Sequence, residues 1–165
     1  MRLNLHEIIN IPGGSIPFSY ELDLAGLTFE GIKAMTSPVP VTGQVENIAG
    51  VLTLTADTAV DLVCVCARCL QEFSMQKPLH VEAVLADEAQ DEDNPDIFLL
   101  DGDYIDVDEV MITAFVLNMD QRFLCREDCK GLCEKCGKNL NDGPCDCKAE
   151  KDPRLAILSQ LLENE

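Results

Sequence analysis

The sequence lacks tryptophan, and aromatic residues make up only 5% of its 165 residues. A core must therefore be built from Leu, Val, Ile and Ala, for which the 47% hydrophobic content suffices. No apolar run approaches the ~20 residues that a membrane helix needs. The first residues lack the charged start and long apolar stretch of a signal peptide. These absences predict a soluble, cytoplasmic protein without membrane contact.

Positively charged residues are also scarce, since 12 Lys and Arg stand against 30 Asp and Glu, for a net charge of −18. The first 120 residues carry 21 acidic and 4 basic side chains, whereas residues 121–154 carry 7 acidic and 8 basic ones. A negative surface repels nucleic acid at long range. We therefore expect no DNA binding, RNA contact only through the C-terminal part, and a basic protein as the easier partner.

Catalytic motifs are lacking as well. The sequence has no phosphate-binding glycine loop, no nucleophile elbow and no HExxH motif. His6 and His80 are its only histidines, and the alternation around His80 puts that ring on the solvent face of a strand. We therefore expect no enzymatic activity.

The first 86 residues are rich in the period-two alternation of half-buried strands. Residues 25–38 are weakly patterned, and a turn near Asp57 is expected to separate two strands. Short strands at this spacing predict an antiparallel sheet or a small barrel. The expected strands are 2–9, 16–24, 39–45, 51–56, 59–65 and 79–85.

The stretch that follows is acidic, because residues 87–109 contain 11 acidic side chains and no basic one. It predicts a solvated loop over 87–105, or alternatively a docking strip for a basic partner. Asp106 and Glu109 then form a capping-box pattern, which predicts a helix over about 107–118 within a helix-and-connection segment, 106–124.

The chain ends in a second helix signal. Asp152 and Pro153 are typical of a helix start and are followed by a leucine stripe, which predicts a terminal helix within 151–165. The expected fold is therefore α+β: a β-rich part over 1–86, one central helix, a cysteine module over 125–150 and the short terminal helix.

Nine cysteines are unevenly distributed, with six of them between Cys125 and Cys147. Cys64, Cys66 and Cys69 lie about sixty residues earlier. Because the cytosol keeps thiols reduced, such clusters favour metal or redox chemistry over disulfides.

Spacing predicts one metal site that closes locally. Two cysteines separated by two residues reach one metal from a tight turn, and Gly137 can supply positive φ just after the second cysteine. The turn-forming residues 139–143 then return the chain to a Cys-x-Cys pair. We call this set the local tetrad: Cys133, Cys136, Cys145 and Cys147.

The remaining cysteines predict a second site between the sheet and the C-terminal part. We call it the long-range tetrad: Cys66, Cys69, Cys125 and Cys129. Here residues 66–69 would form a zinc knuckle between two strands, and zinc binding of order 10 kcal/mol can offset the closure of a ~60-residue loop. A second partition puts residues 125, 129, 133 and 136 on one metal. Cys64 is left over as a small buried hydrophobe.

Two CxxC pairs with CxxxC and CxC nearby indicate metal, and zinc is the expected ion at both sites. Iron is the main rival, because four thiolates also hold iron centres and iron–sulfur clusters. A thiol redox switch comes next, although neither CxxC opens a helix in a thioredoxin-like pattern.

These motifs resemble the YceD family, the large ribosomal RNA subunit accumulation proteins. The resemblance covers most of the chain. The motifs that carry it are Cys66-Ala-Arg-Cys69-Leu70, Cys125-x3-Cys129-Lys-Gly-Leu-Cys133-x2-Cys136-Gly-x-Asn139-Leu-Asn141, Cys145-x-Cys147 and Asp152-Pro-Arg-Leu-Ala156.

The resemblance implies a non-enzymatic bacterial factor, also found in plastids, that is needed for normal 23S rRNA levels and large-subunit assembly. Expected partners are a large-subunit ribosomal protein, precursor rRNA, or both. Either the acidic half would hold a basic ribosomal protein, or five basic side chains would contact RNA phosphates: Arg122, Arg126, Lys130, Lys135 and Lys138. The alternatives are a zinc- or redox-responsive regulatory module and a purely structural zinc ribbon in another complex.

Overall fold

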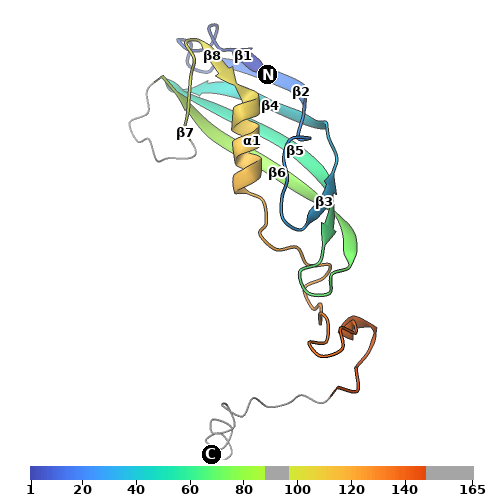
Figure 1. Cartoon of the computed structure of the whole chain (residues 1–165). Coiled ribbons are helices and arrows are strands. Elements are labelled where there is room, and N and C mark those ends of the chain that lie inside the picture. The colour runs from blue at the N-terminus through green and yellow to red at the C-terminus, as the bar shows by residue number, and fades with distance from the viewer. Residues whose placement is uncertain (88–96, 148–165) are drawn as a thin grey trace, which may run out of the picture.

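The computed structural model describes residues 1–87 and 97–147 (Figure 1). Its main element is one open, six-stranded sheet, in which β2, β4, β5, β6 and β7 follow one another and β3 pairs with the far end of β5. All neighbours are antiparallel except β6 and β7. The strands are β2 (Ser15–Leu22), β3 (Ile32–Met35), β4 (Val39–Ile48), β5 (Val51–Val65), β6 (Glu72–Ala86) and β7 (Ile97–Leu99).

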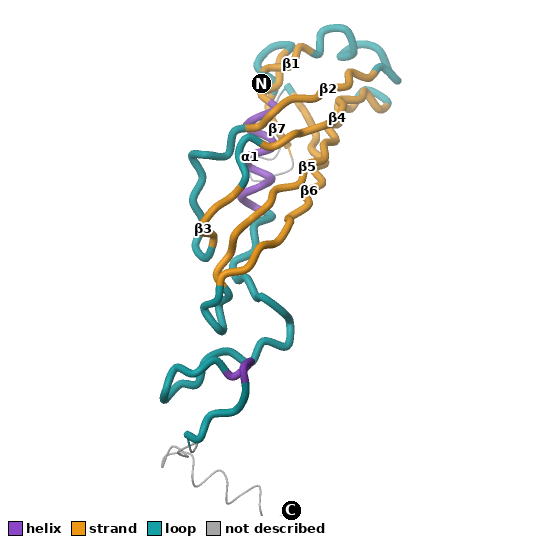
Figure 2. The backbone as a smooth tube through the Cα atoms, turned by 90° about the vertical axis from the view of Figure 1, so that its right-hand side faces the viewer, coloured by secondary structure: helices purple, strands orange, loops and turns teal. Residues whose placement is uncertain are grey.

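The long hairpin of β5 and β6 dominates the sheet and reaches toward the C-terminal segment (Figure 2). The expected turn near Asp57 is wrong, because β5 runs unbroken through it and Asp57 pairs with His80. Inward positions are buried at every second residue on both sides of this point, and Asp57 faces solvent, so the period of two is never interrupted. On β6, Leu79, Val81, Ala83 and Leu85 are buried and His80 faces solvent, as the alternation over 79–85 indicates.

A tight turn joins β4 and β5, in the gap between the strands expected over 39–45 and 51–56. Ala49 and Gly50 have φ of 54° and 96°, the backbone that a two-residue antiparallel turn requires. Asn47 is buried beside it and donates from Nδ2 to the carbonyls of Ile8 and Ile9 at 2.7 and 2.8 Å. The N-terminal segment is thereby held against the sheet.

Helix α1 (Val107–Leu117) lies across one face of the sheet and buries Val107, Val110, Met111 and Phe115 (Figure 1). It begins as the sequence predicts, because Asp106 Oδ1 accepts a hydrogen bond from the backbone N–H of Asp108 at 3.1 Å. The helix and sheet confirm the α+β class. Within the described residues, none of the helices is long and apolar enough to cross a membrane.

Some segments carry more structure than the pattern indicated, and others less. The acidic stretch 87–105 contains β7 and most of β8 (Tyr104–Asp106), because Ile97 and Phe98 extend the sheet edge and Ile105 is buried. β8 pairs with β1 (Arg2–Asn4), which is all that forms of the strand expected over 2–9. β3 lies in the weakly patterned stretch. The terminal helix expected over 151–165 lies outside the described residues.

Candidate metal centres

The first cysteine knuckle is the turn between β5 and β6. Cys66 closes it, donating its backbone N–H to the carbonyl of Gln71 at 2.9 Å and accepting from the N–H of Leu70 at 2.9 Å. Leu70, directly after Cys69, has a φ of 60°. This turn points both sulfurs of the pair away from the hairpin, toward the segment that follows α1.

The second knuckle repeats this backbone arrangement at Cys133. Its N–H donates to the carbonyl of Lys138 at 2.8 Å, and its carbonyl accepts from the N–H of Gly137 at 2.8 Å. Gly137, directly after Cys136, has a φ of 70°. Both knuckles thus have positive φ directly after the second cysteine. The sequence indicates this backbone at Gly137, whereas the first knuckle adopts it with a leucine.

The segment after α1 returns to the first knuckle through backbone hydrogen bonds. Ala67 N–H donates to the carbonyl of Phe123 at 2.8 Å, and Leu132 N–H donates to the carbonyl of Arg68 at 3.2 Å. The Arg68 guanidinium also donates from Nη1 to the carbonyls of Glu127 and Cys129, at 3.1 and 2.9 Å. These contacts bring residues 125 and 129 beside the knuckle although about sixty residues separate them along the chain.

The long-range tetrad has the geometry that a tetrahedral metal requires. Its four sulfurs lie within 4.8 Å of one another. Cys66 Sγ is 3.8 Å from Cys129 Sγ, and Cys69 Sγ is 3.7 Å from Cys125 Sγ. Four thiolates at the usual zinc–sulfur distance stand about 3.8 Å apart. The site is enclosed, since Cys66, Cys69 and Cys129 are at most 3% exposed.

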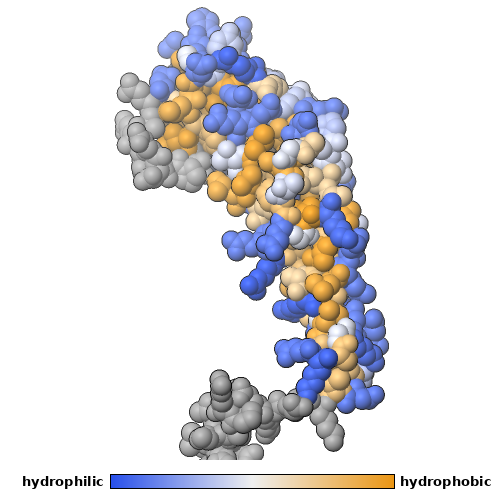
Figure 3. Space-filling view, in the orientation of Figure 1, coloured by the Kyte–Doolittle hydropathy of each residue, from blue (hydrophilic) through white to orange (hydrophobic). Residues whose placement is uncertain are grey.

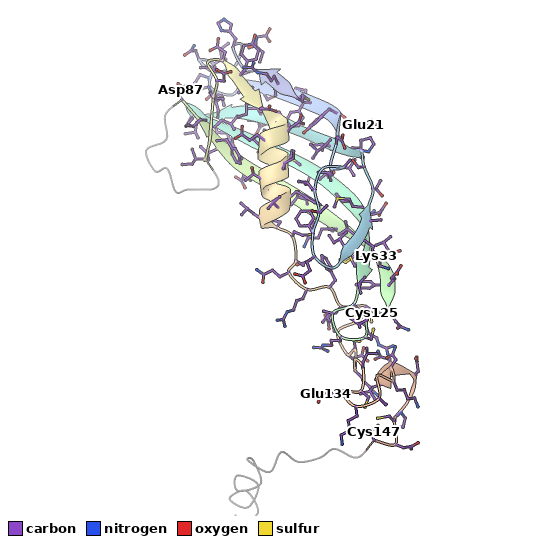
Figure 4. The ribbon with its side chains drawn as sticks, in the orientation of Figure 1. Glu21, Lys33, Asp87, Cys125, Glu134 and Cys147 are labelled. Carbon is purple, nitrogen blue, oxygen red and sulfur yellow. The ribbon has the colours of Figure 1, made fainter. Side chains whose placement is uncertain are left out.

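The local tetrad also brings its four sulfurs within 4.8 Å of one another. The short helix η1 (Leu140–Asp142) lies between its two cysteine pairs and turns the chain back. This site is more open, because Cys133 and Cys145 are half-buried and Cys136 is exposed. Figure 4 shows Cys125 near the tip of the long hairpin and Cys147 farther along the molecule.

Thiol pKa values diverge within each tetrad. Burial opposes ionisation of Cys66, but nearby backbone N–H groups lower its pKa to about 6. Burial and the neighbouring thiols raise the pKa of Cys125 to about 12. In the local tetrad, the backbone N–H groups of Cys136 and Lys135 lower the pKa of Cys133 to about 6, whereas the Cys136 thiol and burial raise that of Cys147 to about 12.

This divergence follows from crowding like charges, because four adjacent thiolates repel one another. A divalent cation at the centre would remove that repulsion and bind all four in the deprotonated form. The donor set of each tetrad therefore fits zinc or another thiophilic ion, and it leaves no ligand position open.

The structure groups the eight sulfurs in the two sets that spacing favours, and not in the second partition. Cys64 belongs to neither tetrad and is fully buried in the main hydrophobic core, as predicted for a small buried hydrophobe. Sequence reasoning missed two positioning side chains, those of Arg68 and Asn141. Asn141 Nδ2 lies 3.3 Å from Cys129 Sγ, whereas its sequence context indicated only a turn former.

Fold and site together define an α+β protein with two tetracysteine centres of the kind that hold structural metal ions. The family described as the large ribosomal RNA subunit accumulation protein YceD matches residues 52–162, which include both tetrads. The chain therefore belongs to the YceD family.

Individual relatives agree with this assignment. Uncharacterized proteins of Mycobacterium bovis and Mycobacterium tuberculosis are 30% identical to the chain over 126 residues, which is 74% of this chain and 61% of theirs. The chloroplastic large ribosomal RNA subunit accumulation protein YCED homolog 1 of Arabidopsis thaliana is 43% identical over 56 residues, 33% of this chain and 15% of that protein. No solved structure matches the chain.

Proposed function

We propose that this protein is a non-enzymatic, cytoplasmic factor that supports accumulation of 23S rRNA and assembly of the large ribosomal subunit, with structural zinc at both tetrads. The observation that carries the proposal is the family match, which spans the β5–β6 hairpin and all eight tetrad cysteines. Zinc is the best candidate for the ion, because an enclosed set of four thiolates suits it and its ligand geometry.

Zinc would act in the architecture and not as a Lewis acid. A centre with four protein ligands leaves no position for a substrate. At the long-range tetrad the ion would clamp the hairpin tip to the segment after α1, so that both move as one body. At the local tetrad it would close the loop over 133–147.

The histidines support a role without catalysis. His6 Nδ1 lies 2.8 Å from Asp103 Oδ2, and His80 Nδ1 lies 2.7 Å from Asp57 Oδ1. All four side chains are well exposed, and neither pair adjoins a tetrad cysteine in the described contacts. We assign both to hydrogen-bonded pairs at the surface, which contribute little to stability.

Charge favours a basic protein as the partner of the sheet. Residues 1–120 carry 21 acidic and 4 basic side chains, and hydrophilic side chains gather at the end formed by β1 and β8 (Figure 3). Near the tetrads, cations are engaged within the fold: Arg126 pairs with Asp128 at 3.5 Å, and Lys138 Nζ donates to the carbonyl of Pro144 at 2.8 Å. A large-subunit ribosomal protein would complement these acidic residues, whereas precursor rRNA would have to compete with the intramolecular partners of the cations at the cysteine-rich end.

Depletion in cells tests the role. Loss of the protein should lower 23S rRNA relative to 16S rRNA and reduce large subunits on a sucrose gradient. Complementation by the wild-type gene should restore both. Unchanged rRNA and gradients after deletion would overturn the proposal.

The choice of partner is tested with purified components. A ribosomal protein should be captured by tagged protein at moderate salt. For precursor rRNA, a dissociation constant that rises steeply with salt concentration would indicate phosphate contacts. If no RNA binding is measured, the ribosomal protein remains as the proposed partner.

A second role as a thiol-redox module is favoured by the local tetrad alone. Cys136 is exposed, and the pKa of Cys133 is lowered to about 6, so this site offers a reactive thiolate to oxidants. Mild peroxide should then release one metal ion and form disulfides that thiols reverse. Retention of both ions under peroxide would eliminate this role.

A further inference from the structure

Asn141 belongs to the loop of one cysteine site but contacts a cysteine of the other. It lies in η1, between the two cysteine pairs of the local tetrad. Its Nδ2 donates to the sulfur of Cys129, in the long-range tetrad, at 3.3 Å. Such a contact from outside the metal shell orients a ligand and stabilises its thiolate form.

The amide of Asn141 is held in one orientation. Its Oδ1 accepts from the backbone N–H of Lys130 at 2.8 Å, and its Nδ2 also donates to Asn139 Oδ1 at 2.8 Å. Exchanging the amide oxygen and nitrogen would turn an oxygen toward the Cys129 sulfur and toward Asn139 Oδ1, and a donor toward the Lys130 N–H. The N–H···S contact is therefore specified by all three neighbours.

Backbone pairing ties the same two segments together. Leu140 N–H donates to the carbonyl of Gly131 at 2.9 Å, and Leu132 forms a β-bridge with Asn139. Residues 130–132 connect the last cysteine of the long-range tetrad to the first of the local one. Segment 139–141 of the local loop thus packs directly on this connection.

We infer that Asn141 couples the two centres, so that closing the local tetrad around its ion strengthens metal binding at the long-range tetrad through the hydrogen bond to Cys129. The inference rests on the proposed function in one respect, that both tetrads hold zinc. Coupling between binding sites is reciprocal, so an ion in the long-range tetrad also favours closure of the local loop.

The test replaces Asn141 with aspartate in the full chain. Asn141→Asp keeps the shape and the acceptor for Lys130 but removes the N–H donor to sulfur. With ¹¹³Cd in place of zinc, each site gives its own resonance, and chelator competition gives each affinity. Affinity at the long-range tetrad should fall by about 10- to 100-fold, the usual loss for a contact of this kind.

The matched control separates the added charge from the lost donor. Asp142 is exposed and follows Asn141 in the same loop. Asn141→Asp combined with Asp142→Asn therefore keeps the net charge of the loop but still lacks the N–H donor to the Cys129 sulfur. This double variant should lose as much affinity at the long-range tetrad as Asn141→Asp alone, whereas Asp142→Asn alone should retain the wild-type affinities and ¹¹³Cd shifts.

A double-variant comparison isolates the coupling. Cys145→Ser opens the local tetrad and should weaken the long-range tetrad in the wild-type background, but add little after Asn141→Asp. Recovery of the wild-type long-range affinity when Asp142→Asn is added to Asn141→Asp, or fully additive effects of Cys145→Ser and Asn141→Asp, would overturn the inference. If Asn141→Asp disorders the loop, Cys145→Ser still tests the inference by itself. A long-range tetrad whose affinity is unchanged by Cys145→Ser would then overturn the coupling. A wild-type chain that binds no metal would instead refute structural zinc.

Discussion

The two tetrads share one knuckle geometry but differ in what they connect. In the long-range tetrad, buried sulfurs join a hairpin tip to a segment about sixty residues away. In the local tetrad, more exposed sulfurs close a loop of fifteen residues, 133–147. Because loop-closure entropy and burial differ, similar metal geometry should have unequal consequences for the fold. The long-range tetrad is the joint between sheet and C-terminal part, whereas the local tetrad shapes mainly its own loop and reaches the long-range tetrad through Asn141.

The largest difference is expected between Cys66→Ser and Cys145→Ser. Cys66→Ser should release one ion and loosen both the hairpin tip and the segment that contacts it, because those contacts surround the long-range tetrad. Cys145→Ser should also release one ion but disorder mainly the local loop. Elemental analysis with amide hydrogen exchange measures both effects.

The metal count is the internal control for that pair, since each variant should retain one of two ions. Equal loss of protection in β5 and β6 for both variants would contradict the difference in role between the tetrads.

A smaller contrast is expected between two glycines with positive φ. Gly131 has a φ of 73°, and an added Cβ would lie 3.0 Å from the carbonyl oxygen of Arg68, beside the long-range tetrad. Gly137 has a φ of 70° in the local tetrad, with open space around it. Alanine at 137 should cost roughly 1 kcal/mol from backbone strain, and alanine at 131 about 2 kcal/mol because the close contact is added.

Thermal unfolding of the zinc-loaded protein, together with the rate of zinc release to a chelator, measures these costs. Equal destabilisation by the two alanines would show that the packing of Gly131 on Arg68 is unimportant.

The smallest effect is expected from Leu70→Gly. Leu70 has a φ of 60° and a 63% exposed side chain, so the leucine keeps a strained backbone and buries little. Glycine should relieve roughly 1–2 kcal/mol of strain and lose part of that to chain entropy, for a net gain of under about 1 kcal/mol. The readout is the unfolding midpoint, and a lower midpoint would mean that Leu70 packs on something that stabilises the knuckle.

Much of the site could be read from the sequence, because ligand spacing is a local property. A CxxC followed by glycine, and turn formers before CxC, specify the local loop almost alone. The long-range set followed from the cysteines that the local tetrad leaves, with Cys64 left over as a buried hydrophobe. The start of α1 at Asp106 and the inward face of β6 were also predictable, since capping and alternation depend on neighbours in the chain.

Other features depended on contacts between distant residues, which no local pattern encodes. β5 continues through Asp57 because β4 and β6 pair on either side of it. The acidic stretch still forms β7 and β8, because Phe98 and Ile105 pack on the main hydrophobic core, which outweighs solvation of the acidic side chains around them.

The sequence by itself determined the class of fold and which cysteines can share an ion, because alternation and ligand spacing act over a few residues. Only the tertiary structure decided how the two centres meet. Arg68, which precedes Cys129 in the sequence, and Asn141, which follows it, both donate hydrogen bonds to Cys129. Those contacts arise from packing the hairpin tip and the loop of the local tetrad on the same short connection. These contacts join residues that are distant in the sequence, so local patterns of residues do not predict them.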